Sequence, residues 1–274
     1  MNNKTLFVIA AGLSTRFNGQ PKHLAKIKNR YVLENTLALA SNYYDLIYVV
    51  VNCQADFSTI ETTRNIAKAY NANIIEIYSG KGDADAVYRA INSIDVVGNV
   101  SICWGDAWFN TSNIFEIASQ SIDIDMSDNV FNAFCAIEDN PYGWFELETD
   151  SKTIKYAAFK NELDYEIKKD NAIHDQCFFN INVKNFNSLF EAYEKAILVK
   201  KNDIETVIKN GNSLFKIAIK YEISWYKMIN WEKYIRNNSG NANFGKSSIV
   251  TILDKSNVMS FNTKEDLKEI EKHA

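Results

Sequence analysis

The sequence has little cysteine, proline and histidine, and it has no long hydrophobic run. Among its 274 residues, four are cysteine, two are proline and three are histidine. No apolar run approaches the roughly 18 residues of a membrane helix, so we expect no membrane insertion. The histidines show no metal-ligand spacing, which argues against a zinc site. The cysteines form no Cys-x-x-Cys pair, and their apolar neighbours predict buried thiols in a reducing compartment. They are Cys53, Cys103, Cys135 and Cys177.

Positive charge is not in excess either. Lys and Arg total 30 against 34 Asp and Glu, for a net charge of −4. A polyanion binder usually carries the opposite balance, so nucleic acid is not an expected partner. Apolar residues make up 46% and aromatic residues 13%, enough for a full core, which excludes a disordered or collagen-like chain. Met1–Lys4 runs into an apolar stretch without a small-residue cleavage site. We interpret that stretch as a core strand, not a secretion signal, and expect a cytoplasmic protein.

The first half of the sequence alternates strand and helix patterns. Short apolar runs predict buried strands at residues 5–11, 46–51, 73–78 and 99–104. Helical patterns occupy residues 32–43 and 84–94, and a capping-box pattern, Ser58 with Glu61, predicts another helix start. This alternation predicts parallel strands joined by right-handed crossovers. We therefore expect an α/β fold with a Rossmann-like, mixed but mainly parallel sheet flanked by helices.

The second half predicts a smaller, β-rich part. Strand patterns cover residues 130–138, 144–149, 153–159, 176–183, 214–222 and 249–253. Helices are expected from Phe186 to about residue 200, over Asp203–Asn210 with Gly211 past its end, and from Thr263 with Asp266 three residues on. The stretch at 237–246 is the best loop candidate. We expect a domain at residues 1–236, divided near residue 125, and a C-terminal appendage at 237–274.

A turn of small residues with two positive charges follows the first strand. Residues 10–24 read AAGLSTRFNGQPKHL. Such a turn lets backbone N–H groups approach phosphates closely. Ser14 and Thr15 add hydroxyl donors, while Arg16 and Lys22 add positive charges, a set that suits a triphosphate. The run is neither a Walker P-loop nor a dinucleotide fingerprint, and the alternative is a solvated turn with incidental charges.

This run resembles the signature of nucleotidyltransferases of the sugar-phosphate and phosphocholine type, A-A-G-x-G-[ST]-R followed after a short gap by P-K-x-L. The matching residues are Ala10, Ala11, Gly12, Thr15, Arg16, Pro21, Lys22 and Leu24. Glu34 matches the helix that usually follows, whereas Ser14 and Asn29 replace glycines of the family pattern. The resemblance implies catalytic roles for Arg16 and Lys22. It also implies nucleotide binding by Ala10, Ala11, Gly12, Leu13, Ser14 and Thr15.

Two later segments fit the same family in the right order. Gly80–Val87 resembles the G-T-A-x-A segment, which implies that Gly82, Asp83 and Ala84 contact the nucleotide; Asp83 is also a good helix cap. Gly105–Asp106 resembles a strand-end G-D whose aspartate holds Mg2+ and takes part in catalysis. An Asp just past a buried parallel strand lies where α/β sheets bind ligands, and its oxygens suit Mg2+. An ordinary turn aspartate is the alternative for Asp106.

The resemblance is looser from Asp106 to about Glu232. It implies a nucleotide-binding half up to residue 125 and an acceptor-binding half at 126–236. Residues 154–160 resemble the strand whose lysine reaches the acceptor phosphate, which implies that role for Lys160 although Phe159 replaces the usual Glu. Asn180 is a second acceptor candidate.

The family's second metal-binding aspartate is absent from the expected position. Trp225–Trp231 lacks the Asp of the family's Trp-x-Asp-like stretch. Either Asn230 or Glu232 substitutes for it, or the site uses Asp106 with phosphate oxygens and more water. The aromatic residues of this stretch suggest a core edge, an acceptor pocket wall or a dimer face, so the oligomeric state, a homo-oligomer included, stays open.

The resemblance implies Mg2+-dependent transfer of a nucleotidyl group from a nucleoside triphosphate to a phosphorylated small molecule, with release of pyrophosphate. The short gap between Arg16 and Pro21 resembles the cytidylyltransferase and phosphocholine-type branches of the family more than the long-loop hexose-phosphate branch, which implies CTP. The resemblance further implies that the acceptor is a sugar phosphate, phosphocholine or a similar metabolite and that the product serves surface glycan or capsule synthesis. Two alternatives remain: a glycosyltransferase that uses Asp83–Asp85 as a D-x-D, and a nucleotide-binding homologue without turnover.

Overall fold

A computed structural model describes residues 3–12, 17, 19–78, 81–126, 128–139, 141–159, 171–209, 223–239, 245, 247–254, 258–261 and 263–273. The strands are β1 (Thr5–Ala10), β2 (Lys26–Ile27), β3 (Arg30–Tyr31), β4 (Leu46–Asn52), β5 (Asn73–Ile77), β6 (Asn99–Trp104), β7 (Ala107–Phe109), β8 (Phe131–Glu138), β9 (Gly143–Leu147), β10 (Ile154–Phe159), β11 (Ala172–Asn182), β12 (Ser248–Ile252) and β13 (Val258–Ser260). The helices are the short 3-10 helix η2 (Lys22–Leu24), α1 (Val32–Ala40), α2 (Phe57–Ala69), α3 (Asp83–Asn92), α4 (Asn113–Asp125), α5 (Val183–Lys209), α6 (Trp225–Ser239) and α7 (Lys264–His273).

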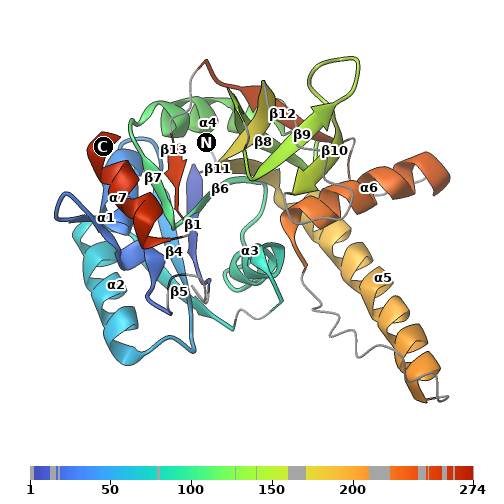
Figure 1. Cartoon of the computed structure of the whole chain (residues 1–274), viewed down its shortest axis with the longest axis horizontal. Coiled ribbons are helices and arrows are strands. Elements are labelled where there is room, and N and C mark those ends of the chain that lie inside the picture. Colours follow the sequence, from blue (N-terminus) through green and yellow to red (C-terminus); the bar gives the residue numbers. More distant parts are fainter. Residues whose placement is uncertain are drawn as a thin grey trace.

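Nine of the described strands form one mixed sheet. Its order is β10-β9-β11-β6-β1-β4-β5, with β8 paired to β11 and β12 paired to β8. Strands β6, β1, β4 and β5 are parallel. The long strand β11 runs antiparallel to β6 and joins this parallel half to the β-rich half around β8 and β9 (Figure 1). The expected α/β fold, with a mainly parallel sheet and a smaller β-rich part, is confirmed.

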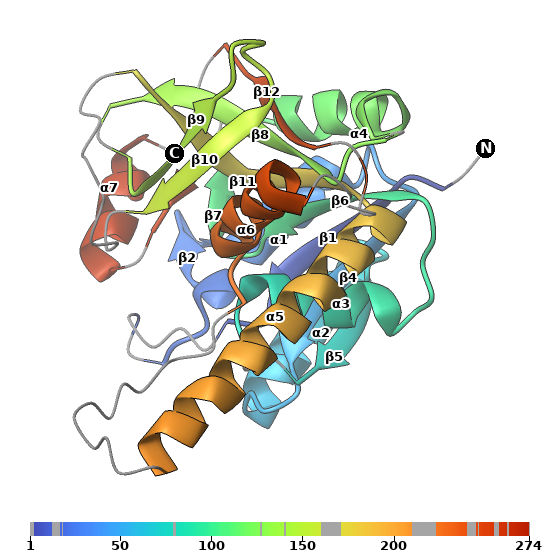
Figure 2. The ribbon, with the colours of Figure 1, turned by 90° about the vertical axis from the view of Figure 1, so that its right-hand side faces the viewer.

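Helices bury both faces of the sheet, which explains the continuous apolar run of β1. Leu6 and Val8 face a core shared with α1, α2 and α4, whereas Phe7 and Ile9 face a core shared with α3, α5 and α6. Figures 1 and 2 show α1 and α2 on one side of the sheet and α3, α5 and α6 on the other. A strand covered on both faces has no solvent side, so it shows no alternation.

Three helices differ from the sequence-based expectation. Helix α2 begins after Asp56, not at Ser58, because the Asp56 carboxylate accepts the backbone N–H of Thr59 at 2.9 Å. Helix α5 is one long helix, not two, since residues 183–209 contain neither glycine nor proline to interrupt it (Figure 2). Helix α6 occupies a segment that the sequence left unassigned. The strand expected at 214–222 lies outside the described residues.

The C-terminal residues belong to the core, so the expectation of a separate appendage at 237–274 is wrong. Strand β12 extends the main sheet in parallel to β8, and β13 pairs antiparallel with β7. Helix α7 contacts β2 of the β2–β3 hairpin (Figure 2). Its start is as expected: the Asp266 carboxylate accepts the backbone N–H of Thr263 at 2.9 Å, and the Thr263 hydroxyl accepts that of Asp266 at 3.1 Å. The polar stretch at 237–246 does not mark a domain boundary, because β12 pairs with the main sheet after it.

Three of the four cysteines are buried. Cys103, Cys135 and Cys177 are buried as expected, and burial raises the pKa of each thiol, but Cys53 is exposed. None of the helices in the described ranges combines the length and apolar composition needed to cross a bilayer.

Candidate active site

Three predicted site segments meet at one edge of the sheet. Ala11 and Gly12 follow β1, Asp106 follows β6, and the turn before α3 follows β5. Because β6, β1, β4 and β5 are parallel, their carboxyl ends lie at the same edge. Within this arrangement β1 lies directly between β6 and β4. The topology thus gathers segments that are far apart in the sequence.

Lys22 and Asp106 form an ion pair at this edge. The Lys22 Nζ donates to Asp106 Oδ2 at 2.9 Å. The Lys22 side chain is 12% exposed and that of Asp106 is 43% exposed, so the carboxylate is the more open partner. Lys22 begins η2 directly after Pro21, whose fixed φ suits the residue before a helix. Two of the three residues that the resemblance implied for catalysis, Lys22 and Asp106, are therefore in contact.

Gly105 determines how closely Asp106 approaches β1. Its backbone N–H donates to the Ile9 carbonyl at 2.9 Å, which continues the β1–β6 pairing by one residue. A Cβ on Gly105 would lie 2.9 Å from the Cβ of Ala10 and 3.1 Å from the Ile9 oxygen. Both belong to a buried strand that cannot give way easily. The glycine therefore allows Asp106 to follow β6 next to the end of β1.

His23 anchors the turn that carries Lys22. This buried imidazole lies with its Nε2 2.9 Å from Thr63 Oγ1 on α2. The Thr63 hydroxyl itself donates to the Thr59 carbonyl at 2.7 Å, so it accepts from His23, which must carry its proton on Nε2. Burial lowers the pKa of His23 to about 4, although the charge of Asp106 acts in the opposite direction. A neutral His23 thus ties η2 to α2.

The structure describes only some of the expected nucleotide-binding residues. Arg16 and residues 13–15 of the signature lie outside the described residues. Ala10 is half-buried, Ala11 is buried, and Gly12 is exposed with open space where a Cβ would be. The backbone of Gly12 thus has room for a ligand to approach closely.

The N-cap of α3 is Gly82, whereas the sequence suggested Asp83. Gly82 occupies the N-cap position with a φ of 123°, a region that favours glycine, and α3 begins at Asp83. The Asp83 carboxylate still binds this first turn, because its Oδ1 accepts the N–H of Ala84 at 2.7 Å and that of Trp225 at 2.9 Å. Ala84 is fully buried. Asp83 therefore joins α3 to the start of α6.

The structure does not place either acceptor candidate, Lys160 or Asn180, at the site. Lys160 lies outside the described residues. Asn180 is fully buried under α4, where its Oδ1 accepts from the Ser101 hydroxyl at 2.6 Å and its Nδ2 donates to the Ala118 carbonyl at 3.0 Å. Both ends of the amide are thus bound inside the protein. The expected acceptor contact by Asn180 is therefore wrong, because this side chain faces the core.

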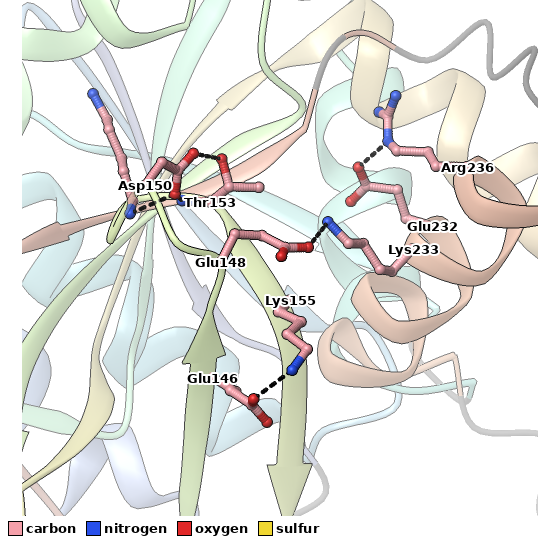
Figure 3. A network of polar contacts seen from close by, with 9 residues as sticks. Glu146, Glu148, Asp150, Thr153, Lys155, Glu232, Lys233 and Arg236 are labelled. Atoms are coloured by element: carbon pink, nitrogen blue, oxygen red, sulfur yellow. Dashed lines mark hydrogen bonds and ion pairs between the residues drawn. The ribbon is translucent and has the colours of Figure 1, made fainter.

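Neither substitute for the second metal-binding aspartate is available. The Asn230 amide makes two 2.8 Å hydrogen bonds with the backbone N–H and carbonyl of Ala157, which attach α6 to β10. The Glu232 carboxylate binds Arg236 Nε at 2.7 Å and the Ser248 hydroxyl. Figure 3 shows Glu232 and Arg236 together on α6, near the Glu148–Lys233 ion pair to the β9–β10 hairpin. These residues hold α6 in place.

The D-x-D alternative does not fit the geometry. Asp85 is buried, and both of its carboxylate oxygens accept from Arg89 Nε, at 3.0 and 2.9 Å. Asp83 binds two backbone N–H groups, as described above. Over the described ranges, no group of three or more His, Cys, Asp or Glu side chains is arranged to hold a metal. Asp83 and Asp85 therefore serve α3, and their contacts do not support the D-x-D metal site that the glycosyltransferase alternative needs.

Asp106 fits Mg2+ as a single-carboxylate site. Mg2+ is commonly held by one or two carboxylates, with substrate phosphates and water completing the octahedron. Asp106 offers a half-exposed carboxylate at the ligand-binding edge, next to the positive charge of Lys22. Such a site needs a bound nucleotide to be complete, which agrees with the missing second aspartate.

A cavity of about 460 Å³ lies between the ends of β8 and β11 and the β13–α7 segment. Its lining includes Glu138, His174, Met259, Ser260, Asp266 and Glu269. Ser260 pairs with Ala107, the residue after Asp106, so the cavity wall continues from the candidate site. Sequence reasoning missed it because its walls come from three distant segments.

Comparison with known proteins shows a similarity to nucleotidyltransferases in the first half of the chain. Residues 6–133 match the model of the MobA-like NTP transferase domain. This part of the chain, less than half of it, is therefore similar to nucleotidyltransferases, as the sequence motifs indicated. The nucleotidyltransferase match includes Lys22 and Asp106 and ends inside β8. No curated protein sequence matches the chain.

Solved nucleotidyltransferase structures share the fold over the whole chain. The CTP:phosphocholine cytidylyltransferase of Streptococcus pneumoniae is 11% identical with a TM-score of 0.64, covering 99% of each chain. A nucleoside-diphosphate-sugar pyrophosphorylase of Vibrio cholerae is 14% identical with a TM-score of 0.65, and HddC of Yersinia pseudotuberculosis complexed with GMP-PN is 12% identical with a TM-score of 0.63. Both cover 98% of this chain and 99% of their own. At these identities the likeness shows the fold.

Proposed function

We propose that this protein transfers a nucleotidyl group from a nucleoside triphosphate to the phosphate of a small acceptor and releases pyrophosphate. The observation that carries the proposal is the Lys22–Asp106 pair, at the carboxyl edge of the parallel strands and beside the turn of the signature. A fixed cation next to an open carboxylate suits a triphosphate with its metal.

In the proposed reaction an acceptor phosphate oxygen attacks the α-phosphorus in line. The bond from that phosphorus to the bridging oxygen breaks, and pyrophosphate leaves. The attacking phosphate is already ionised near neutral pH, so the protein needs no strong general base. Its contribution is positioning and charge neutralisation. Lys22 would neutralise the α-phosphate, where charge builds, and Arg16 of the signature would hold the β- and γ-phosphates.

Mg2+ is part of the proposal, and Asp106 is the residue that would hold it. When bound, the ion neutralises phosphate charge and fixes the orientation of the α-phosphate. Asp106 binds Lys22 in the structure, so the lysine supplies a positive charge at the carboxylate before substrate arrives.

We propose CTP as the nucleotide and the cavity beside β13 as the place for the acceptor. The short gap between Arg16 and Pro21 supports CTP. The described lining of the cavity carries three carboxylates and an imidazole, which favours an acceptor whose organic part bears hydroxyl groups or a cationic nitrogen over one with carboxylates. Phosphocholine and sugar phosphates both meet this condition. We place the reaction in the cytoplasm, with products for surface glycan or capsule synthesis.

The test is pyrophosphate release with Mg2+, with CTP, UTP, dTTP, ATP and GTP crossed against phosphorylated sugars, alcohols and amines. We expect release with one nucleotide and a narrow set of acceptors, and a mass that corresponds to the nucleoside-diphosphate-linked product. Hydrolysis of a nucleotide sugar without any triphosphate would contradict the proposal.

A binding protein without turnover is the second candidate, and the absence of the second aspartate favours it. It predicts Mg2+-dependent triphosphate binding, measured by calorimetry, without pyrophosphate release from any pair. Binding without release across the complete panel would therefore replace the enzyme proposal with this one.

A further inference from the structure

An aromatic ring from the C-terminal end of the chain lies against Lys22. The Lys22 Nζ lies 5.8 Å from the centroid of the Phe261 ring. Phe261 is buried, and it directly follows β13. In the antiparallel β13–β7 register Ser260 lies opposite Ala107, so the chain at Phe261 continues alongside Asp106. The ring therefore reaches the candidate active site from a segment far away in the sequence.

The same ring also contacts the signature turn. Its centroid is 5.7 Å from that of Phe17 in an edge-on arrangement, and Phe17 directly follows Arg16. Both rings belong to a small apolar cluster, together with Ile27, Val32, Trp108 and Ile270. Phe261 thus contacts both ends of the stretch from residue 17 to residue 22.

The contact between Lys22 and Phe261 has the geometry of a cation–π interaction. Ammonium groups within about 6 Å of a ring centroid are attracted by its negative face, and the attraction grows as water is removed. The Lys22 side chain is largely covered, so the ring and the Asp106 carboxylate both act on its ammonium. Because the Phe261 ring stays in place, it would keep the Lys22 ammonium at the site when the Asp106 carboxylate binds Mg2+ instead.

We propose that Phe261 is a positioning residue that holds the Lys22 ammonium at the site, and that the segment 258–261 is therefore part of the active site. The proposal rests on the proposed function only in giving Lys22 a role towards substrate. The placement of Lys22 itself is testable without any substrate.

The first experiment measures acetylation of Lys22 by acetic anhydride, quantified by mass spectrometry against the exposed Lys68 of the same molecule. Three full-length variants are compared with wild type: Phe261→Leu, Phe261 replaced by pentafluorophenylalanine, and Ile27→Val. Pentafluorophenylalanine keeps the shape of the ring but reverses its quadrupole, whereas Ile27→Val removes a methylene from the same cluster and leaves the ring intact. Phe261→Leu and the pentafluorophenylalanine variant both lose the negative ring face, so the acetylation rate of Lys22 relative to Lys68 should rise about threefold to tenfold. In Ile27→Val the same relative rate should change by less than about twofold.

The second experiment is steady-state kinetics with the substrate pair that supports wild-type turnover. Phe261→Leu and the pentafluoro variant should lower kcat about threefold to thirtyfold while KM for the nucleotide changes less than about twofold. A purely structural role would leave the pentafluoro variant like wild type in both assays, and that result would overturn the proposal. Changed Lys22 acetylation in a protein without turnover on any pair would support the placement of Lys22 and contradict only the proposed function.

Discussion

At the scale of residues, the charges proposed to meet the substrate come from a short helix and from a strand end. Lys22 lies at the start of η2 and Asp106 directly follows β6. The pair is only partly buried, so it contributes little to stability. The close approach of Gly105 to β1 and the buried imidazole of His23 nevertheless hold the two backbones in place. This combination is what a site for a charged ligand requires.

We therefore expect Lys22→Gln and Asp106→Asn each to lower kcat at least about a hundredfold, since each removes a charge that neutralises the phosphates. Circular dichroism melting should stay close to wild type in both variants. Lys68→Gln, on the exposed side of α2, is the matched control and should change kcat by less than about twofold. Full Mg2+-dependent activity in Asp106→Asn would contradict the metal assignment.

His23 should make stability depend on pH. Its folded pKa of about 4 lies below its ordinary value of 6.5 because burial disfavours the imidazolium. Between these values the unfolded chain binds the proton and the folded chain does not. Stability is therefore complete above pH 6.5 and falls as the pH drops towards 4, by roughly 2–3 kcal/mol.

Urea unfolding at several pH values between 7 and 4 tests this expectation. In His23→Gln the amide still reaches Thr63 but does not titrate, so we expect a shallower loss of stability than in wild type. Identical pH dependence in the two proteins would show that His23 does not stay neutral in the folded state.

The sequence predicted Lys22 and Asp106 because both lie in short motifs whose residue order carries the resemblance. It could not predict that Asn180 faces the core, because a strand pattern does not say which face a helix covers. Phe261 was missed for a related reason. A single phenylalanine carries no motif, and its contact with Lys22 exists only through the β13–β7 pairing.

At the scale of elements, the packing of α6 explains why the aromatic stretch of the sequence was hard to interpret. Trp225, Tyr226, Met228 and Ile229 are all buried because α6 packs on β10 and on α5. A helix buried on several sides loses the 3.6-residue alternation by which helices are recognised. The strands of the parallel half, in contrast, were predictable because short apolar runs between helices are typical of buried parallel strands.

Asn230 is the residue that attaches α6 to β10, so Asn230→Asp tests its role. A carboxylate accepts from the Ala157 N–H but cannot donate to the Ala157 carbonyl. We expect the free energy of unfolding to fall by about 1–3 kcal/mol, measured by urea titration. Mg2+ affinity in the presence of nucleotide should not change. Tighter Mg2+ binding in Asn230→Asp would mean that the second metal position is here after all.

At the scale of the whole molecule, the end of the chain completes the fold. Strand β12 lies parallel to β8, β13 lies on β7, and α7 closes the small apolar cluster that contains Phe17 and Phe261. Such long-range pairings leave no trace in local sequence patterns, which is why the expected domain boundary at residue 236 was wrong. The fold class was predictable from local order, but the closure of the sheet was not.

Truncation at two points should separate these contributions. Removing everything after residue 245 deletes β12, β13 and α7, and we expect the cooperative thermal transition to be lost in calorimetry, because β8 loses one of its two partner strands and the apolar cluster opens. Removing only the residues after 261 deletes α7 and should leave one cooperative transition at lower temperature. A wild-type melting curve after truncation at 245 would restore the idea of an appendage.

The central claim, nucleotidyl transfer to an acceptor phosphate, is tested most directly by following the oxygen atoms. The acceptor is labelled with 18O in its phosphate and incubated with the matching triphosphate and Mg2+, and the products are examined by 31P NMR and mass spectrometry. Our account predicts that the label is kept in the diphosphate of the nucleotide-linked product and is absent from pyrophosphate. A nucleoside monophosphate carrying solvent oxygen, with the labelled acceptor unchanged, would identify a hydrolase and contradict the account.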